Sequence, residues 1–566
     1  MSDQKLAVNE YLKTDSDYLR GTINEGLQTE VTGAFSEGDQ QLIKFHGFYQ
    51  QDDRDLRNER KAQKLEPLYS FMLRARVPGG VCTPEQWLGV DKIASELTSS
   101  NSIRLTTRQT FQYHGIPKRN LKTIIQGLDR QALDSIAACG DVNRNVMCNP
   151  NPVESKLHQQ AYEWAKKLSD HLLPHTQAYA EIWLDKEKLV STADEQPLEP
   201  VYGKTYLPRK FKMAVAVPPD NDVDVYTNDL GFVAVADGDE LVGFNLTAGG
   251  GMGSTHGETD TFPRLADDFG FIRAEDTLKF AEAVMTVQRD WGNRVNRKRA
   301  RLKYTIVDHG YDAFKAEVEK RVGKAFEAKR EVIIGDRGDR YGWVKGIDNQ
   351  WHLTLYIESG RVKDQPGKML QTGLREIAKV HKGDFRMTSN QNMIVASVAE
   401  QDKAEIEGLA RQHGLLGEVI SQTRGHSIAC VALPTCSLAM AEAERYFPDF
   451  ISKVEALQDK HGFAEQAIVV RITGCPNGCA RPFAAEIGLV GKAPGRYNLY
   501  LGASYEGTRL NKMYRENVQE AEILEVLDTL FAQYATERQK GETFGNFTVR
   551  TGVVGAVLDA AKDFHG

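Results

Sequence analysis

Two pairs of cysteines constrain this chain more than any other feature. Cys475 and Cys479 stand four positions apart in a tight Pro/Gly turn, Thr473–Cys479, which directly follows a β-rich run. Cys430 and Cys436 form a second pair upstream, also after a short apolar run. A strand that ends in such a turn can aim both thiolates of a pair at one soft metal centre. Two loops would thus deliver four thiolates, which is the standard ligand set of a cubane iron–sulfur cluster.

Other uses of the four cysteines stay open at this point. A structural zinc ion also accepts four thiolates, but its paired cysteines usually have two residues between them, and neither pair here has that spacing. The cysteines could also be unligated. Disulfides are not expected, because nothing in the sequence marks the chain as secreted. A protein that only binds zinc or an iron–sulfur cluster is therefore the non-enzyme alternative.

The composition is that of an ordinary globular protein. Of the 566 residues, 41% are hydrophobic and 26% are charged, and the length predicts several domains. The net charge of −7 argues against nucleic-acid binding as the main task. No run approaches the ~18 apolar residues of a membrane span, and the polar start has no apolar signal segment. We therefore expect a cytoplasmic protein with no membrane or nucleic-acid partner, in which thiols stay reduced.

The sequence indicates an internal duplication. Three segments of the first half resemble three segments of the second in residue pattern. The matched pairs are 103–110 with 384–392, 211–217 with 467–472, and 244–249 with 497–502. Only the second half carries the four paired cysteines, so a single metal site would lie asymmetrically in a pseudo-symmetric frame. We interpret Cys82, Cys139 and Cys148 as buried thiols.

The cysteine spacing resembles a family signature. Thr-Gly-Cys, three residues, Cys, six residues and Glu-Ile-Gly-Leu is similar to the signature of sirohaem-dependent sulfite and nitrite reductases, and the 38 residues between Cys436 and Cys475 also fit that family. Its members hold a 4Fe-4S cluster with four cysteines, and the last cysteine also bridges to the sirohaem iron. The resemblance implies that Cys430, Cys436, Cys475 and Cys479 are cluster ligands, with Cys479 shared.

The resemblance also implies a positively charged pocket, because sirohaem carries eight carboxylates and arginine can hold a carboxylate with two bonds. The segment 102–115 is expected to be a strand that presents polar side chains to one side. A basic run follows at 296–304, for which a solvated helix face is the alternative. The residues implied to bind sirohaem are Arg104, Thr106, Arg108, His114, Lys303 and Cys479.

Four other cations match the substrate-binding cations of the family. They are Arg74, Arg144, Lys210 and Lys212. A site for a small dianion such as sulfite needs cations that neutralise the oxyanion and relay protons, and a lysine crowded by cations can act as an acid. Lys210 and Lys212 are two positions apart on an apparent strand, so both should point to one face.

Two further segments are interpreted as follows. The run Gly249–Gly253 lacks the Gly-x-Gly-x-x-Gly spacing of a dinucleotide loop, and we interpret it as a place where backbone approaches a flat cofactor. Residues 1–65 are polar and are expected to form an extended arm. Within it, residues 42–55 closely resemble the start of family members that dock a flavoprotein partner through the extreme N-terminus.

The resemblance implies an α+β nitrite/sulfite reductase fold, internally duplicated about a pseudo-twofold axis, with ferredoxin-like half-domains and two larger mixed α/β domains. The expected units are a partner-docking arm at 1–65, half-domains at 66–140 and 340–420, a sirohaem and substrate domain at 141–335, and a 4Fe-4S and sirohaem domain at 421–566.

The implied activity is assimilatory: a haemoprotein subunit that reduces sulfite to sulfide with six electrons, passed through the cluster and sirohaem. NADPH would be oxidised by a separate flavoprotein alpha subunit that contains FAD and FMN. A sirohaem nitrite reductase or a ferredoxin-dependent sulfite reductase is the alternative, and the arm favours the flavoprotein-coupled form.

Overall fold

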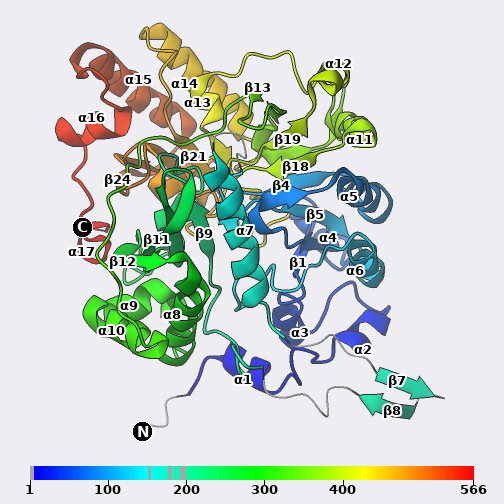
Figure 1. Ribbon diagram of the computed structural model, residues 1–566. Coiled ribbons are helices and arrows are strands. Elements are labelled where there is room, and N and C mark those ends of the chain that lie inside the picture. The colour runs from blue at the N-terminus through cyan, green and yellow to red at the C-terminus, as the bar shows by residue number, and fades with distance from the viewer. Residues whose placement is uncertain (1–4, 151–154, 176–180, 185–186, 192–198, 566) are drawn as a thin grey trace.

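The architecture is a mixture of sheets and helices. The computed structural model describes residues 5–150, 155–175, 181–184, 187–191 and 199–565. Within these residues the chain forms four five-stranded sheets and two two-stranded ribbons, with helices around them (Figure 1). The ribbons pair β7 (Glu181–Leu184) with β8 (Glu187–Ser191), and β16 (Asp364–Gln365) with β17 (Lys368–Met369).

Two of the five-stranded sheets, those of the half-domains, have shorter strands, and each takes its last strand from the other repeat. The first sheet has the order β1 (Phe48–Asp52), β2 (Tyr69–Arg74), β5 (Phe111–Ile116), β4 (Ile103–Leu105) and β15 (Arg361–Val362). The second has the order β13 (Gly342–Lys345), β14 (Trp351–Leu355), β19 (Met393–Val398), β18 (Asp384–Met387) and β3 (Val81–Cys82). Because β15 pairs with β4 and β3 pairs with β18, the exchange joins the two half-domains reciprocally.

The helices of the half-domains pack over one shared core. They are α5 (Pro84–Leu97), α6 (Leu121–Asp129), α11 (Leu370–Val380) and α12 (Lys403–Gln412). Helix α5 begins after Thr83, whose side chain accepts the Gln86 backbone N–H while the Gln86 side chain accepts the Thr83 backbone N–H. Helices α5 and α11 touch, and the ring of Trp87 lies 5.8 Å from that of Phe385 in the second repeat. The two half-domains therefore form one packed unit.

The two larger sheets also share one topology. The first has the order β12 (Asp267–Arg273), β11 (Glu240–Ala248), β10 (Leu230–Asp237), β9 (Met213–Ala216) and β6 (Met147–Cys148). The second has the order β20 (Ile428–Ala429), β21 (Val470–Thr473), β22 (Ile487–Ala493), β23 (Arg496–Leu501) and β24 (Lys512–Val518). In both, the first three strands along the chain are parallel and the last two are antiparallel. These matches confirm the predicted duplication.

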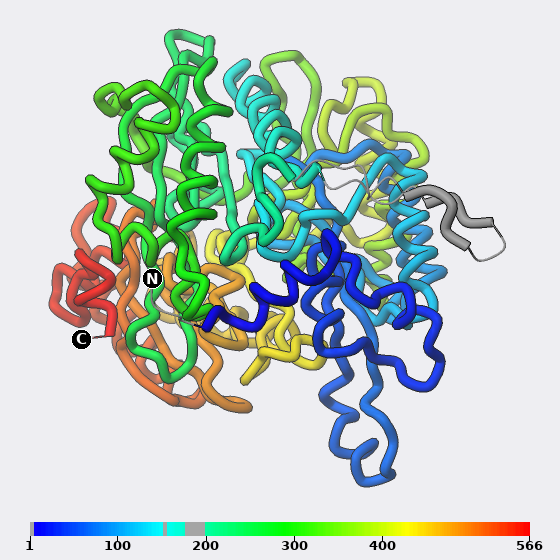
Figure 2. The backbone as a smooth tube through the Cα atoms, turned by 90° about the horizontal axis from the view of Figure 1, so that it is seen from below, coloured from blue at the N-terminus to red at the C-terminus, as the bar shows by residue number. Residues whose placement is uncertain are grey.

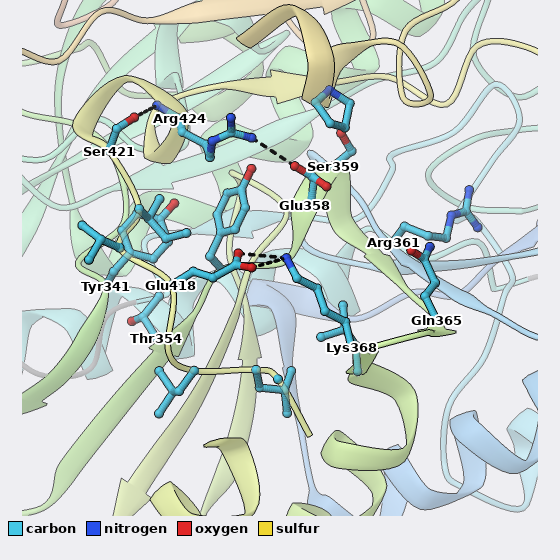
Figure 3. Close-up of a pocket in the computed structure, with 18 of the residues that line it drawn as sticks. Tyr341, Thr354, Glu358, Ser359, Arg361, Gln365, Lys368, Glu418, Ser421 and Arg424 are labelled. Carbon is cyan, nitrogen blue, oxygen red and sulfur yellow. Dashed lines mark hydrogen bonds and ion pairs between the residues drawn. The ribbon is translucent and has the colours of Figure 1, made fainter. Parts of the chain in front are cut away.

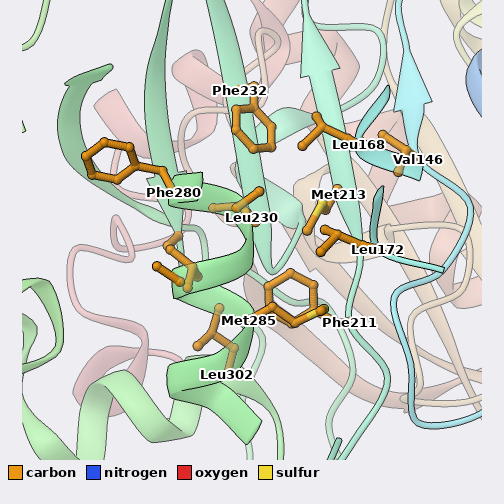
Figure 4. Packing of buried hydrophobic residues seen from close by; sticks show 14 of the residues in the cluster. Val146, Leu168, Leu172, Phe211, Met213, Leu230, Phe232, Phe280, Met285 and Leu302 are labelled. Carbon is orange, nitrogen blue, oxygen red and sulfur yellow. The ribbon is translucent and has the colours of Figure 1, made fainter. Parts of the chain in front are cut away.

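Helices cover both larger sheets. The first is covered by α7 (Lys156–His171), α8 (Thr277–Trp291), α9 (Leu302–His309) and α10 (Tyr311–Val322). The second repeat has α13 (Gln422–Gly425), α14 (Phe447–Lys460), α15 (Glu520–Glu537), α16 (Phe544–Arg550) and α17 (Ala560–Asp563). Apolar side chains of α7 and α8 meet those of β9 and β10 in the first core (Figure 4). The residue pattern from Ser437 to Phe450 is helix-like, but helix α14 begins only at Phe447.

The segment 102–115 is a hairpin and not the single strand that we expected. Strand β4 ends at Leu105, and Thr106 donates its backbone N–H to Thr110 before β5 begins. Gln109 closes the turn with a left-handed φ of 52°, as Gln391 does at φ 72° between β18 and β19. The alternating pattern predicted extended backbone correctly, but it carried no clear turn residue. The hairpin brings β5 back beside β4.

The N-terminal residues are more ordered than an extended arm. They form α1 (Val8–Thr14), α2 (Ile23–Gln28), α3 (Glu37–Leu42), β1 and α4 (Arg57–Ala62). Helix α1 is anchored because Lys13 donates to the Leu207 carbonyl and Glu10 binds Arg294. Figure 2 shows this segment lying across one face of the molecule. Since β1 pairs with β2, the arm continues into the first half-domain sheet.

A buried carboxylate joins the two repeats. Asp224, from the loop between β9 and β10, binds Arg471 Nη1 at 2.6 Å, Arg337 Nη1 at 2.9 Å and Arg481 Nε. Burial alone would raise the pKa of Asp224, but the three guanidiniums outweigh it and hold that pKa below its ordinary value. Arg471 and Arg481 flank the cysteine turn. The fold of the second repeat therefore depends on an anion from the first.

We expect Asp224→Asn to lower the free energy of unfolding by about 3–5 kcal/mol, because it leaves three buried guanidiniums without their counter-charge. Urea unfolding followed by tryptophan fluorescence measures the loss. Asp239→Asn removes a carboxylate from an exposed turn and should stay within about 0.5 kcal/mol of the parent. Equal urea midpoints for Asp224→Asn and the parent would contradict this role.

Candidate cofactor and anion site

One cavity of about 330 Å³ lies between the two repeats and collects nearly all of the predicted site residues. All four paired cysteines line it. The predicted cations and polar residues at its wall are Arg74, Arg104, Thr106, Arg108, His114, Arg144, Lys210 and Lys212. The second repeat therefore supplies the sulfur side of the cavity, and the first repeat supplies the positive side.

The cysteines lie at the ends of neighbouring strands. Cys430 follows β20, and Cys475 and Cys479 follow β21; because these strands are parallel, their carboxyl ends meet at one edge of the sheet. Gly474 donates its backbone N–H to Cys430 Sγ at 3.2 Å, and Asn477 Nδ2 lies 3.5 Å from Cys475 Sγ. Hydrogen bonds to sulfur of this kind set the potential of iron–sulfur clusters.

The thiols of this edge need a metal to ionise. Burial, followed by repulsion from Cys479, raises the pKa of Cys475 to about 12, and the same two causes raise the pKa of Cys430. Across the described part of the chain, no three His, Cys, Asp or Glu side chains converge on a position for one metal ion. A cubane cluster gives each thiolate its own iron, and binding it releases the thiol protons. The donor set fits such a cluster.

The arginines of the opposite wall are held by the protein itself. Arg108 donates to Asn228 Oδ1 and to the carbonyls of Asn145 and Met213. Arg144 donates to the carbonyls of Gly140 and Ala138. These bonds fix the guanidiniums before any ligand arrives, which lowers the entropy cost of binding one.

Arg104 is held across the repeat boundary. Its Nε donates to Glu444 Oε2 at 2.8 Å and its Nη2 to the Ala429 carbonyl at 2.9 Å. Glu444 also binds Arg361, and its backbone N–H donates to the Cys430 carbonyl. One carboxylate thus positions a cation of the first repeat beside the strand end that carries Cys430.

Lys210 and Lys212 differ from these arginines in that the described part of the protein does not bind their charged groups. Within the described chain neither ammonium has a hydrogen-bond partner, and both line the wall. Burial, followed by the charges of Arg209 and Arg301, lowers the pKa of Lys210 to about 7. Burial, followed by Lys210 and Arg108, lowers the pKa of Lys212 well below its ordinary value. Two crowded, unpaired ammonium groups are stabilised by an anion and can donate protons to it.

Polar atoms at the same wall also lack partners. Arg108 Nε and His114 Nδ1 are buried atoms without a hydrogen bond among the described residues. His114 is 3% exposed, and burial followed by Arg361 lowers its pKa well below its ordinary value. An orphaned guanidinium N–H and a neutral imidazole beside unpaired ammonium groups suit a ligand with many carboxylates.

One predicted residue and one predicted contact lie elsewhere. Lys303 is fully buried but is not among the cavity-lining residues; its ammonium binds the carbonyls of Gly251, Gly253 and Phe262. The glycine run that we expected against a flat cofactor packs against protein instead. Ser254 donates its N–H to the Pro476 carbonyl, and a Cβ at Gly253 would lie 3.3 Å from the Asn477 carbonyl oxygen. Lys303 therefore holds the Gly251–Gly253 backbone, and that segment in turn packs against the cysteine turn.

Sequence reasoning missed several members of the wall. They are Lys44, Tyr49, Gln112 and Arg209, whereas Arg297, which also lines the wall, belongs to the basic run 296–304 that the sequence singled out. With its amide oxygen facing Arg74, Gln112 accepts from Arg74 Nε at 3.1 Å. Arg209 sits inside the basic stretch that flagged Lys210, so that stretch was a usable signal. The remaining three cysteines, Cys82, Cys139 and Cys148, are buried as predicted.

A second, larger cavity of about 1000 Å³ lies beside α11 and α14 (Figure 3). Its charges already pair with one another, as Lys368 with Glu418 and Arg424 with Glu358. No cysteine is among its lining residues in the described chain. We therefore assign the chemistry to the smaller cavity, where cations and thiols face each other.

The comparisons with known proteins agree on one family. Residues 163–326 match the family "Nitrite and sulphite reductase 4Fe-4S domain", and residues 63–131 and 345–413 each match the "Nitrite/Sulfite reductase ferredoxin-like half domain". The 163–326 match lies in the first repeat, so the four paired cysteines are outside it. The two half-domain matches coincide with the two strand-exchanged sheets.

Full-length relatives are also similar. The "Sulfite reductase [NADPH] hemoprotein beta-component" of Shewanella sp. (strain ANA-3) is 85% identical over 566 residues, which is all of both chains. That of Shewanella baltica (strain OS155) is 84% identical over the same span. The solved structure of the Mycobacterium tuberculosis NirA protein has a TM-score of 0.77 at 23% identity and covers 97% of each chain, which shows the fold.

We expect sulfate to bind more weakly as the pH rises through about 7, because Lys210 is charged below its pKa and neutral above it. Sulfate stays a dianion over this range, so the change reports the protein. Calorimetric titration between about pH 6 and 8.5 should show up to a tenfold loss per pH unit at the upper end. Lys210→Arg should flatten the profile, and a parent whose affinity is flat across this range would contradict the assignment.

Proposed function

This chain belongs to the nitrite and sulfite reductase family, and from that premise we infer that it is the haemoprotein subunit of an NADPH-dependent assimilatory sulfite reductase. It reduces sulfite to sulfide with six electrons, using a sirohaem and a 4Fe-4S cluster. The observation that carries this proposal is the single cavity in which four thiols from one repeat face the cations of the other. The full-length relatives favour sulfite over nitrite as the substrate.

We propose Cys430, Cys436, Cys475 and Cys479 as the ligands of the cluster, with Cys479 shared with the sirohaem. Arg104, Thr106, Arg108 and His114 would bind the sirohaem carboxylates, and Lys303 would support the site through the Gly251–Gly253 backbone. When bound, the two groups would supply the redox chemistry: the sirohaem as the centre at which sulfite is reduced and the cluster as a store of electrons. The unpaired buried atoms of the wall support this assignment.

The substrate is held and protonated by the chain's own residues. Arg74, Arg144, Lys210 and Lys212 are proposed to neutralise the sulfite oxygens, which leave as water. Arg144 is fixed by backbone carbonyls, so it is proposed to bind and orient the sulfite oxygens. Lys210 has its pKa near neutrality, so its Nζ can give a proton to a departing oxygen and regain one from water.

We propose that electrons arrive from a flavoprotein subunit that docks on residues 1–65. Helix α1 buries Glu10 and Lys13 but leaves Val8 and Tyr11 exposed, with Val8 67% accessible, and Leu6 just before the helix is exposed too. Apolar side chains rimmed by charge are suited to a protein interface. Among the described residues, no helix has both the length and the apolar character to cross a bilayer. We place the protein in the cytoplasm because cluster ligands must stay reduced.

We expect Cys479→Ser to change the visible spectrum of the purified protein and to abolish sulfite turnover, because one thiol would serve both metal centres. The matched control is Cys148→Ser, which alters a buried thiol outside the cavity and should keep the spectrum. Iron and labile sulfide analysis of the same samples reports the cluster. A colourless parent without labile sulfide would overturn the proposed function.

We expect Val8→Asp to weaken the flavoprotein complex at least tenfold and to slow NADPH-driven turnover, because it places a charge on the exposed face of α1. Turnover from a chemically reduced donor should not change. Val419→Asp is the matched control, since Val419 is 98% exposed beside the larger cavity. Undiminished binding of Val8→Asp would remove α1 from the docking surface.

A further inference from the structure

The turn after β1 reaches from the arm to the cysteine loop of the other repeat. Arg54 donates its backbone N–H to the Pro434 carbonyl at 3.2 Å, and its Nη1 donates to the Cys436 carbonyl at 3.2 Å and to the Ala439 carbonyl. Figure 2 shows the blue turn beside the yellow segment that follows residue 430. Three bonds from one residue thus hold the backbone on both sides of Cys436.

The turn is built to present this one side chain inward. Arg57, at the start of α4, binds Asp52 through Nε at 2.8 Å and Nη2 at 2.7 Å, so its charge is paired there. Asp53 Oδ1 accepts the backbone N–H groups of Asp55 and Leu56. Asp55 binds Arg445 Nη1 at 2.6 Å, on the same stretch of the second repeat that Arg54 contacts.

The Cys436 loop lies near the surface, and Leu438 is 63% exposed. Its own backbone bonds are local at Cys436, whose N–H donates to the Ala432 carbonyl and whose carbonyl accepts the Ala439 N–H, while Met440 and Ala441 donate to the Gly474 carbonyl. Without Arg54, the Cys436 carbonyl would keep only the Ala439 N–H, and the Ala439 carbonyl would have to be solvated by water. The loop would then be freer to move, because loops with exposed backbone bonds open most easily.

The charge of Arg54 adds a second effect. Four thiolates give a 4Fe-4S cluster a net negative charge, which becomes more negative when the cluster accepts an electron. A guanidinium is permanently positive, so a nearby Arg54 stabilises the reduced cluster more than the oxidised one. Arg445 is shared by Asp55 and Glu442, and Arg57 is neutralised by Asp52, so neither of these arginines carries an unpaired charge. Arg54 has no acidic partner among the described residues.

We propose that Arg54 is a positioning residue for the iron–sulfur centre: it fixes the loop that carries Cys436 and raises the reduction potential of the cluster. This inference rests on the proposed function, because it requires a bound cluster. It also links the arm on which the electron donor is proposed to dock to a ligand of the centre that receives the electrons.

The test is a redox titration of the holoprotein, followed by electron paramagnetic resonance of the reduced cluster. Arg54→Gln can still donate a hydrogen bond but loses the charge. We expect its midpoint potential to fall by up to about 59 mV, which corresponds to a tenfold change in the one-electron equilibrium constant. Arg54→Lys keeps the charge and should stay near the parent. Arg57→Gln is the matched control, since it removes an arginine of the same turn that binds only Asp52.

A second readout is the rate at which an iron chelator removes the cluster. It should rise for Arg54→Gln and Arg54→Lys, because both lose the Nη1 group that donates to the two carbonyls, and stay unchanged for Arg57→Gln. If Arg54→Gln does not retain its cluster, the Arg54→Lys potential and chelation rate decide the matter. A parent-like potential and chelation rate in Arg54→Gln, or equal shifts in Arg57→Gln, would overturn the inference. A parent without any cluster would instead overturn the proposed function.

Discussion

The carboxylate of Asp224 holds the two repeats together at a point where a strictly symmetric duplication would place two like charges. Asp224 and Arg481 occupy equivalent positions in the two repeats, each six residues before its strand, β10 or β22, and each with a left-handed φ. Identical repeats would place two like charges face to face at this point. Divergence of one repeat to an acid and of the other to a base turns that repulsion into a buried ion pair. Arg481 then also donates to Thr107 and Ser389, the equivalent carbonyls of the two hairpins.

The same symmetry explains why only one of two equivalent cavities is suited to an anionic cofactor. Cys479 and Asp222 are equivalent, each eight residues before β22 or β10; Thr107 donates its hydroxyl to the Cys479 carbonyl, and Ser389 does so to the Asp222 carbonyl. The cavity beside Asp222 measures only about 20 Å³ and also carries two other carboxyls. Burial, followed by Asp220, raises the pKa of Asp222 well above its ordinary value. An acidic wall of this size disfavours a polycarboxylate ligand.

The sequence singled out residues that line the cavity more readily than it indicated how the strands are connected. The four cysteines and the cations Arg104, Arg108 and Lys210 could be found, because each stands in a short local motif. Glu444 could not be found, since its partner Arg104 is 340 positions away and neither residue marks the other. The strand exchange was equally hidden, because β3 and β15 are two residues long and pair across repeats. Lys303 illustrates the opposite case. Its basic motif predicted a residue of the cavity wall, but its ammonium group binds backbone carbonyls away from the cavity.

The positive wall has a cost that ties cofactor binding to stability. Burial, followed by neighbouring cations, lowers the pKa values of Lys210 and Lys212, so around neutral pH the folded protein bears a desolvation and repulsion cost that the unfolded chain does not. This destabilisation is fully present below the folded pKa and fades as the pH rises towards the ordinary lysine value. An anionic ligand in the cavity removes the repulsion, so it binds the folded state alone and stabilises it. Arg104, Glu444 and the strand end that carries Cys430 are joined by hydrogen bonds. We therefore expect an anion that neutralises the positive wall to stabilise the cysteine side of the cavity as well. The two halves of the site are therefore expected to fill cooperatively.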